Sequence, residues 1–337
     1  PNLPQLYERG IQRSNTRTDY ARCEIARRNG QIPNFDACTI SQGVVSNRSG
    51  SLELEPEESE NFTAGVVFEP PLPPGYGRLT ITGDYWQVKQ KGLIGLFGDS
   101  NAITLDYFLR MSGSSNPNVQ RAAPTAEDIA AAQSAGLAPV GRIIQVIDNY
   151  SNLTPREVEG VDVAVYYSID DTPWGDFDLK FNAARLLTFF QEPDADKAML
   201  IEAQEAGQID PSIFIAGAES LIQENGLPKW RATATATWRS GPYGAGYFAS
   251  YTGPVDDTSA TLADGTPWRV KSHLTHNLYG QYTFEGGNRW LDETRVRIGV
   301  RNLTDNDPPL ADGTFGYLGE LHSARGRFWY AQIRKRF

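Results

Sequence analysis

The sequence predicts an all-β chain whose antiparallel strands form part of a transmembrane β-barrel. Three observations support this fold class. Apolar and polar residues alternate with period two over many segments, as they do in strands with two different faces. The connections between these segments alternate between short and long. No apolar run reaches the length of about 18 residues that a membrane helix needs, whereas a membrane strand needs only about 9–11 alternating residues.

Composition supports a folded β-protein and argues against nucleic acid as its partner. The 337 residues include 15 Tyr, 15 Phe and 7 Trp, which is too many aromatics for a disordered chain. The 31 Lys+Arg against 41 Asp+Glu give a net charge of −10, and nucleic-acid binding usually needs a basic surface. The sequence opens at Pro1 without a Met or a signal peptide. We therefore expect a fragment of a longer protein.

Nine strand regions account for most of the alternation. They are 62–69, 78–88, 142–169, 176–189, 229–239, 244–252, 270–284, 291–303 and 324–337. The short connections are 70–77, 170–175, 240–243 and 285–290, and the long ones are 89–141, 190–228, 253–269 and 304–323, with 1–61 before them. Outer-membrane barrels have this asymmetry, with short periplasmic turns and long extracellular loops. We therefore expect about nine strands of a partial barrel.

The long segments are predicted to be loops that carry short helices. Residues 1–50 are polar without a sustained period and are interpreted as a long exposed loop. A helix is expected over 124–136, because Thr125 is a suitable N-cap with acidic residues in the turn after it. Further helical character is expected over 194–206 and 211–224.

The two cysteines, Cys23 and Cys38, lie in the same polar segment. We expect a disulfide that closes this loop, which requires an oxidising compartment or a cell surface. Two unrelated thiols are the alternative.

The strand over 229–239 has the most regular alternation in the chain. Ala232, Ala234, Ala236 and Trp238 are expected to face lipid, and the intervening threonines the lumen. Applied to the other strands, the same alternation predicts lumen-facing residues that could contact a substrate. These residues are Asp84, Trp86, Arg231, Arg239, Arg295, Arg297 and Arg301.

No motif for catalysis, a cofactor or a metal is found. The sequence lacks a phosphate-binding Gly-rich loop and a nucleophile elbow. His273 and His276 are three apart on a predicted strand, so they should face opposite sides, and His322 stands alone in a loop. We therefore expect neither an enzyme nor a cofactor.

Five stretches, in order along the chain, resemble TonB-dependent outer-membrane receptors. They are Pro1-Asn-Leu-Pro-Gln-Leu-Tyr, Leu54-Glu-Pro-Glu-Glu-Ser-Glu-Asn, Thr82-Gly-Asp-Tyr-Trp, Asn152 with Glu159-Gly-Val-Asp, and Gly299-Val-Arg-Asn-Leu-Thr-Asp-Asn-Asp-Pro-Pro. Such barrels have about 22 strands around a plugged lumen. The resemblance implies that residues 1–337 are the C-terminal portion of the barrel, and that the plug domain and the N-terminal strands are absent.

The resemblance also implies function and location. A member of this family would reside in the outer membrane of a Gram-negative bacterium as a multi-pass barrel. It would take up a scarce solute, such as a siderophore, vitamin, metal chelate or oligosaccharide, into the periplasm. Its partners would be outer-membrane lipid, the plug and an inner-membrane energy-coupling complex, and the lumen arginines could pair with the plug instead of the substrate. A passive porin-like channel and an outer-membrane barrel enzyme are the alternatives.

The last strand resembles the closing strand of outer-membrane barrels, which the barrel-assembly machinery reads. The residues that carry this resemblance are Trp329, Tyr330, Ile333 and Phe337. Lys335 interrupts the apolar face, but a Lys near the interface can extend its ammonium into water. The resemblance implies that this strand is also an assembly signal.

Overall fold

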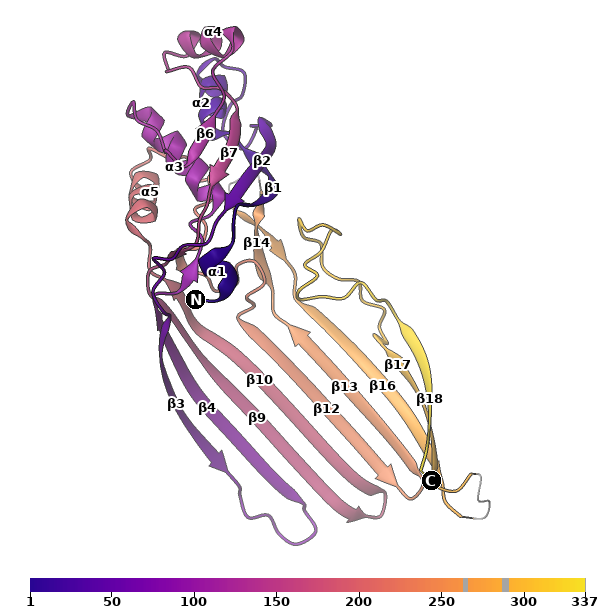
Figure 1. The fold of residues 1–337 in the computed structure, drawn as a ribbon. Helices are drawn as coiled ribbons and strands as arrows, with labels where there is room; N and C mark the ends of the chain where they lie inside the picture. Colours follow the sequence, from indigo (N-terminus) through magenta and orange to yellow (C-terminus); the bar gives the residue numbers. More distant parts are fainter. Residues whose placement is uncertain (263–265, 287–290, 337) are drawn as a thin grey trace.

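The computed structural model describes residues 1–262, 266–286 and 291–336, and its main feature is one antiparallel sheet below an α/β cap (Figure 1). Nine strands lie in the order β18-β17-β16-β13-β12-β10-β9-β4-β3. They are β3 (Glu58–Phe68), β4 (Arg78–Lys91), β9 (Arg156–Thr172), β10 (Gly175–Gln191), β12 (Trp230–Ser240), β13 (Tyr243–Thr252), β16 (His273–Phe284), β17 (Thr294–Arg301) and β18 (Phe328–Lys335). The prediction of nine antiparallel strands is confirmed.

The connections are sorted by length as the sequence predicts. The short turns lie at one end of the sheet, which we call the short-turn end, and the long connections lie at the other, the long-loop end (Figure 1). Within the described residues, β3 and β18 form the two edges of the sheet and do not pair with each other. The structure is therefore an open sheet, as expected of a partial barrel.

The cap consists of residues 1–50, 92–155 and 192–229. Its own four-stranded sheet has the order β1-β2-β7-β6, and β2 and β7 run parallel. Its helices and strands are α1 (Leu3–Tyr7), β1 (Ile11–Thr18), α2 (Tyr20–Arg28), β2 (Ser41–Arg48), β5 (Ile94–Gly95), α3 (Asp99–Met111), β6 (Val119–Arg121), α4 (Ala126–Ser134), β7 (Ile143–Ile147), β8 (Ser151–Asn152), α5 (Ala195–Glu205) and β11 (Glu219–Ser220). Outside the cap, β14 (Val255–Thr261) pairs with β15 (Pro267–Val270).

Two sequence predictions about the cap are wrong. Residues 1–50 form α1, β1, α2 and β2 instead of an exposed loop. The predicted strand 142–169 is divided into β7, β8 and β9, because Ile143 and Val146 are buried in the cap while β9 belongs to the large sheet. Both errors have one cause: β2 and β7 come from distant segments and bury each other's apolar residues.

The helix predictions are partly right. Helix α4 begins at Thr125, whose side chain accepts from the backbone N–H of Asp128 in a reciprocal capping box. Helix α5 matches the prediction over 194–206, but 211–224 contains β11 and turns instead of a helix. Helix α3 was not predicted. It follows Gly98, which has a φ of 97° and provides no capping side chain, so the usual start signal is missing.

The hydrophobic core of the chain lies in the cap. One cluster joins α2, α3 and α5 through residues such as Ile25, Leu105 and Leu200, and a second includes Val44, Ile103 and Val146. Cys23 and Cys38, for which the sequence predicts a disulfide, are bonded, with a Cα–Cα distance of 5.8 Å. The bond fastens α2 to the loop that follows it, and Cys23 is itself fully buried in the core.

The large sheet has two chemically different faces. On one, the register aligns Tyr167, Leu179, Ala236, Tyr247, Leu278, Val300 and Trp329 across seven strands, and we call this the apolar face. Large side chains on it are exposed, such as Ile298 at 59% and Trp329 at 65%. The opposite, polar face carries Asp178, Thr237 and Tyr279. Ala232, Ala234, Ala236 and Trp238 lie on the apolar face, and the threonines between them on the polar face.

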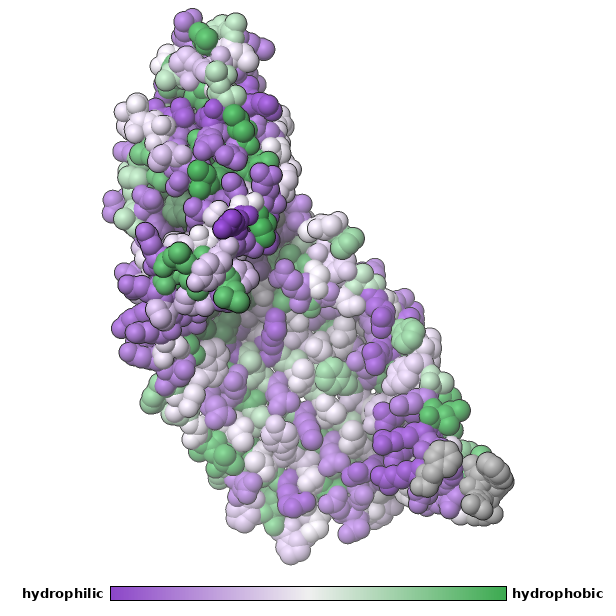
Figure 2. Space-filling model, viewed as in Figure 1, coloured by the Kyte–Doolittle hydropathy of each residue, from purple (hydrophilic) through white to green (hydrophobic). Residues whose placement is uncertain are grey.

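Figure 2 shows hydrophilic and hydrophobic residues interspersed over both the cap and the sheet on the face in view. None of the helices in the described part of the chain is both long and apolar enough to cross a membrane.

The C-terminal strand β18 presents its predicted signal residues on both faces. Trp329 pairs with Val300 and Ile333 with Val296 on the apolar face, while Tyr330 pairs with Gly299 on the polar face. Phe337 lies outside the described residues.

Candidate functional site

All seven residues that the sequence predicted to face the lumen share the polar face. The ladder pairings bring Asp84, Trp86, Arg231, Arg239, Arg295, Arg297 and Arg301 to this side of the sheet. They are not gathered at one point, however. Arg231 lies at the long-loop end of β12, and Asp84 and Trp86 lie in the middle part of β4, whereas Arg239 and Arg295 lie at the short-turn end.

One row of the polar face runs from the middle of β4 to the long-loop ends of β12, β13 and β16 and combines both signs of charge, and we call it the rim row. Its members, paired strand by strand, are Gly65, Asp84, Asp162, Ala184, Arg231, Thr252 and His273. Asp84 and Asp162 are directly opposite each other, and the indole Nε1 of Trp86 donates to Asp162 Oδ2 at 3.1 Å. Three strand spacings of about 4.8 Å put Asp84 roughly 14 Å from Arg231 along the row.

A shallow cavity of about 450 Å³ lies on this part of the sheet. Asp84, Asp162 and Arg231 line it, together with small residues of β9, β10 and β12. Gly65 makes room for Asp84, because a Cβ at Gly65 would come within 2.0 Å of Asp84 Oδ1. A depression with carboxylates at one side and a guanidinium at the other can hold a polar ligand through charge-assisted hydrogen bonds.

Two histidines meet at the end of the rim row. His322, in the connection between β17 and β18, is 6% exposed and its ring lies 5.1 Å from that of His273, centroid to centroid. Burial, with smaller contributions from His273 and Arg231, lowers the pKa of His322 to about 4. The imidazole is therefore neutral at ordinary pH. The expectation that His322 stands alone is wrong, because the connection folds back over β16.

The expectation for the other histidine pair is confirmed. His273 is paired with Thr252 and His276 with Ala249, so the two project from opposite faces of β16. The Nδ1 of His276 lies 2.6 Å from the hydroxyl oxygen of Tyr247 on the apolar face.

Aromatic rings come close to glycines elsewhere on the polar face. Cβ atoms built at Gly246 and Gly299 would meet the rings of Tyr279 and Tyr330 at 2.3 Å and 2.5 Å, so glycine is what lets these rings approach the backbone. The Arg297 guanidinium lies 4.0 Å from the centroid of the Tyr279 ring, a cation–π distance. Arg301 has the same relation to Tyr330 at 5.6 Å. These two arginines are thus held close to the sheet.

Arg239 is committed to a local partner. Its Nη2 lies 3.2 Å from Asp178 Oδ2, and the Arg239 side chain is exposed while Asp178 is half-buried. Arg239 and Arg295 lie at the opposite ends of their strands from the rim row. The structure therefore does not bring them into one site with Asp84.

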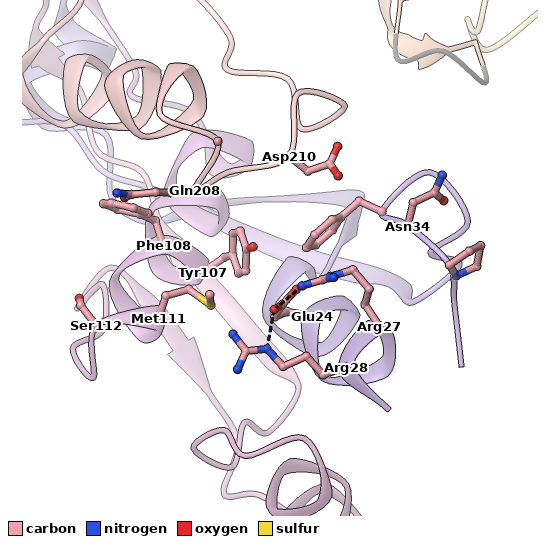
Figure 3. A pocket seen from close by; sticks show the side chains of 13 residues that line it. Glu24, Arg27, Arg28, Asn34, Tyr107, Phe108, Met111, Ser112, Gln208 and Asp210 are labelled. Atoms are coloured by element: carbon pink, nitrogen blue, oxygen red, sulfur yellow. Dashed lines mark hydrogen bonds and ion pairs between the residues drawn. The ribbon is translucent and has the colours of Figure 1, made fainter. Parts of the chain in front are cut away.

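The cap contains a second candidate site, a cavity of about 640 Å³ between α2, α3 and the turn after α5 (Figure 3). Glu24 is at its centre, accepting from Arg27 Nε at 2.8 Å and from Arg28 Nε at 2.7 Å. Burial opposes ionisation of Glu24, but the hydrogen bonds from the two arginines outweigh it and lower the pKa of the carboxyl. The cavity thus presents two guanidiniums whose charge one carboxylate partly balances.

Aromatic side chains form another wall of this cap cavity. Phe35, Tyr107 and Phe108 line it, and the Phe35 and Tyr107 rings meet edge to face at 5.6 Å (Figure 3). Burial raises the pKa of Tyr107 to about 12, so its hydroxyl stays protonated. Guanidiniums beside aromatic faces suit a planar, anionic or hydrogen-bonding ligand. Sequence reasoning missed this site because its residues come from three segments of the cap.

The comparisons with known proteins agree with the fold. The family model described as TonB dependent receptor-like, beta-barrel matches residues 3–303. The chain belongs to this family. No curated protein sequence matches the chain.

Several solved structures of receptors are similar to the chain at low sequence identity. The siderophore receptor PirA from Acinetobacter baumannii has 14% identity and a TM-score of 0.49, with 87% of this chain and 33% of the receptor covered. The ferric enterobactin receptor PfeA from Pseudomonas aeruginosa has 13% identity and a TM-score of 0.48, with 86% of this chain and 33% of the receptor covered. The copper transporter OprC has 14% identity and a TM-score of 0.43, with 84% of this chain and 32% of the transporter covered. The chain thus spans about one third of the length of these proteins.

Proposed function

We propose that this chain is part of an outer-membrane receptor that takes up a scarce solute at the expense of energy. The observation that carries the proposal is the sheet itself: an apolar face, a polar face and all long connections at one end, in a member of the TonB-dependent receptor-like barrel family. In such a receptor the apolar face contacts lipid, the polar face lines the lumen and the cap is extracellular.

Solute capture is assigned to the long-loop end. The cap cavity lies there, with guanidiniums and aromatic rings, and the rim row extends from Asp84 and Asp162 to this end at Arg231. A siderophore, vitamin, metal chelate or oligosaccharide has the polar groups that these residues can bind. A plug domain in the lumen and an inner-membrane energy-coupling complex complete the proposed cycle, and arginines such as Arg295 would contact the plug.

Uptake in cells tests this proposal. Cells producing the wild-type protein are given labelled ferric siderophores, cobalamin, a nickel chelate and oligosaccharides, with and without a protonophore. We expect one of them to accumulate only in energised cells. Asp84→Asn combined with Arg231→Gln should reduce that uptake about tenfold or more, because charge-assisted hydrogen bonds are each worth about 1.5–3 kcal/mol.

The matched control is Arg239→Gln, which removes the same kind of side chain at the short-turn end. It should leave uptake unchanged at equal amounts of protein in the outer membrane. Accumulation that is unaffected by the protonophore would favour a passive channel and contradict the proposal.

The orientation of the two faces can be tested separately by single cysteines. Cysteine at Ala234 should be protected by detergent or lipid, and cysteine at Thr233 should react with a water-soluble maleimide from the lumen. Labelling of the first and protection of the second would reverse the assignment of the faces.

We also propose that β18 acts as an assembly signal. Trp329 and Ile333 form an exposed apolar strip on the edge strand, 65% and 74% exposed. An unpaired edge in lipid leaves backbone groups unsatisfied, so insertion needs recognition of this strand before the barrel closes. Deleting Phe337 should lower the amount of receptor in the outer membrane without changing the affinity of inserted molecules. Normal insertion of the deletion variant would refute the signal.

A further inference from the structure

The His322 side chain is unusual among the buried groups of the molecule. Its residue is 6% exposed, and neither Nδ1 nor Nε2 has a hydrogen-bond partner among the described residues. Leaving a buried polar group without a partner costs free energy, so native proteins nearly always provide one. An imidazole with two free nitrogens in such a place has the donor atoms of a metal ligand still unused.

His273 provides the second donor. It begins β16, while His322 lies 49 positions further along in the β17–β18 connection, yet their ring centroids are 5.1 Å apart and the ring planes meet at 71°. Imidazole nitrogens bind ions such as Zn²⁺ at about 2.0–2.1 Å, which places two rings on one ion about 5 Å apart, centre to centre. The observed separation therefore suits a shared ion without moving the backbone.

Both residues are anchored through their backbones. His273 is fixed by the ladder between β13 and β16, where it pairs with Thr252. The backbone N–H of His322 donates to the carbonyl of Leu318 at 3.0 Å, in a turn that holds the connection in place. A site built from anchored ligands loses little conformational entropy when it binds.

We propose that His273 and His322 form a binding site for a divalent transition-metal ion at the long-loop end of the polar face. Imidazole favours Cu²⁺, Ni²⁺ and Zn²⁺ over hard ions such as Mg²⁺ or Ca²⁺, which prefer oxygen. Among the described residues no group of three or more His, Cys, Asp or Glu side chains could hold an ion. The chain therefore provides two ligands, and water or a chelator provides the rest.

Arg231 determines which form of the ion fits best. Arg231 pairs with Thr252, which in turn pairs with His273, so it lies two strands from His273 in the same row, and within the described part of the chain no ion pair with a carboxylate involves it. A positive charge repels a bare cation but attracts a carboxylate that is bound to the cation. The site should therefore prefer an ion inside an anionic chelate that leaves two coordination positions open for the histidines.

The test uses the protein purified in detergent without a histidine tag. Calorimetric titrations measure the affinity and the stoichiometry for two forms of the ion. These are NiCl₂ and nickel nitrilotriacetate, an anionic chelate with two open coordination positions. We expect one site per chain that is tighter for the chelate. His322→Gln and His273→Gln should each weaken it at least tenfold. His276→Gln is the matched control, because it removes a histidine from the opposite face of the same strand, and it should bind as the wild type does.

Electron paramagnetic resonance with Cu²⁺ adds a readout that folding defects do not imitate. The wild type should show coupling of the copper to two imidazole nitrogens, and each single variant coupling to one. Absence of binding, equal binding by both variants and the wild type, or an equal loss in His276→Gln would overturn the proposal. If His322→Gln does not fold, His273→Gln decides alone, since His273 is only half-buried.

The metal site goes beyond the proposed uptake and does not depend on it. Binding to purified protein can succeed when no transport is seen, and transport of a metal-free solute can be found when the site binds nothing.

Discussion

The cap and the sheet are held together in different ways. In the cap, Cys23, Val146 and Leu200 are completely buried, and Arg121 forms a buried ion-pair cluster with Asp19 and Asp106. The long strands of the sheet contribute little to that core and instead expose apolar side chains on one face. Its ladder hydrogen bonds give it regularity, while exposed apolar side chains such as Ile298 and Trp329 add nothing to a buried core. The cap thus has a core like a soluble domain, and the sheet does not.

The largest expected difference between the two regions concerns a single arginine. Arg121 Nη1 lies 2.7 Å from Asp19 Oδ2 and its Nε 2.8 Å from Asp106 Oδ2, with all three side chains buried. Arg121→Ala should destabilise the cap by about 3–5 kcal/mol, because it leaves buried carboxylates without their partner.

The comparison variant is Arg239→Ala on the sheet, where the arginine is exposed and its partner Asp178 is half-buried. It should cost only about 0–1 kcal/mol. Hydrogen exchange resolved to cap and sheet peptides measures both free energies of opening. Equal losses would show that burial does not distinguish the two regions.

Removal of the disulfide should have the next largest effect, and only in the cap. Cys23 and Cys38 are 15 residues apart, and a loop of this length gives about 3 kcal/mol of stabilisation by loop-closure entropy. The double variant Cys23→Ala/Cys38→Ala should therefore open the cap more often. Exchange of the β12 and β13 amides should not change. If those amides also exchanged faster, the two regions would unfold as one unit.

A pair of glycines tests how closely the polar face of the sheet is packed. A Cβ at Gly246 would come within 2.3 Å of the Tyr279 ring, whereas nothing lies within 4 Å of one at Gly280 on the apolar face. Gly246→Ala should cost about 1–3 kcal/mol by overpacking and displace Tyr279 from Arg297. Gly280→Ala should be close to neutral. Thermal unfolding of the two variants gives the comparison, and identical melting temperatures would contradict close ring–backbone packing.

The smallest expected effect is a dependence on pH at the junction of the two regions. Burial first, and Asp256 second, raise the pKa of Glu224 to about 7. The pKa of Glu224 is higher in the folded loop than in the unfolded chain. Its contribution to the stability of the folded loop is therefore complete below about pH 4.5 and is lost as the pH rises through about 7.

The variant Glu224→Gln cannot ionise, so the loop that contains it should lose less stability between pH 5 and pH 8 than the wild-type loop. The difference should be at most about 1 kcal/mol, since water partly screens the carboxylate. Hydrogen exchange of the 221–227 amides at both pH values measures it. A wild-type loop that is equally stable at both would rule out the raised pKa.

Local patterns in the sequence were sufficient to predict the strands of the sheet and their two faces. Alternation such as that of Ala234 and Thr235 assigns each strand residue to a face, because successive side chains of a strand point in opposite directions. Connection length then placed the long loops at one end. The N-cap Thr125 and the acidic residues Glu127 and Asp128 in the first turn likewise located α4 from neighbouring residues. Each of these features depends on residues that are close in sequence, so the sequence by itself determined them.

Only the tertiary structure showed how the segments of the cap pack together and that His273 and His322 are neighbours. Val45 of β2 is paired with Gln145 of β7, a hundred positions away, and no periodicity marks such partners in advance. His273 and His322 are likewise brought together by the path of a connection whose own sequence has no strand or helix pattern. Burial and partner choice depend on which distant segments meet, and a pattern within one segment contains no information about that.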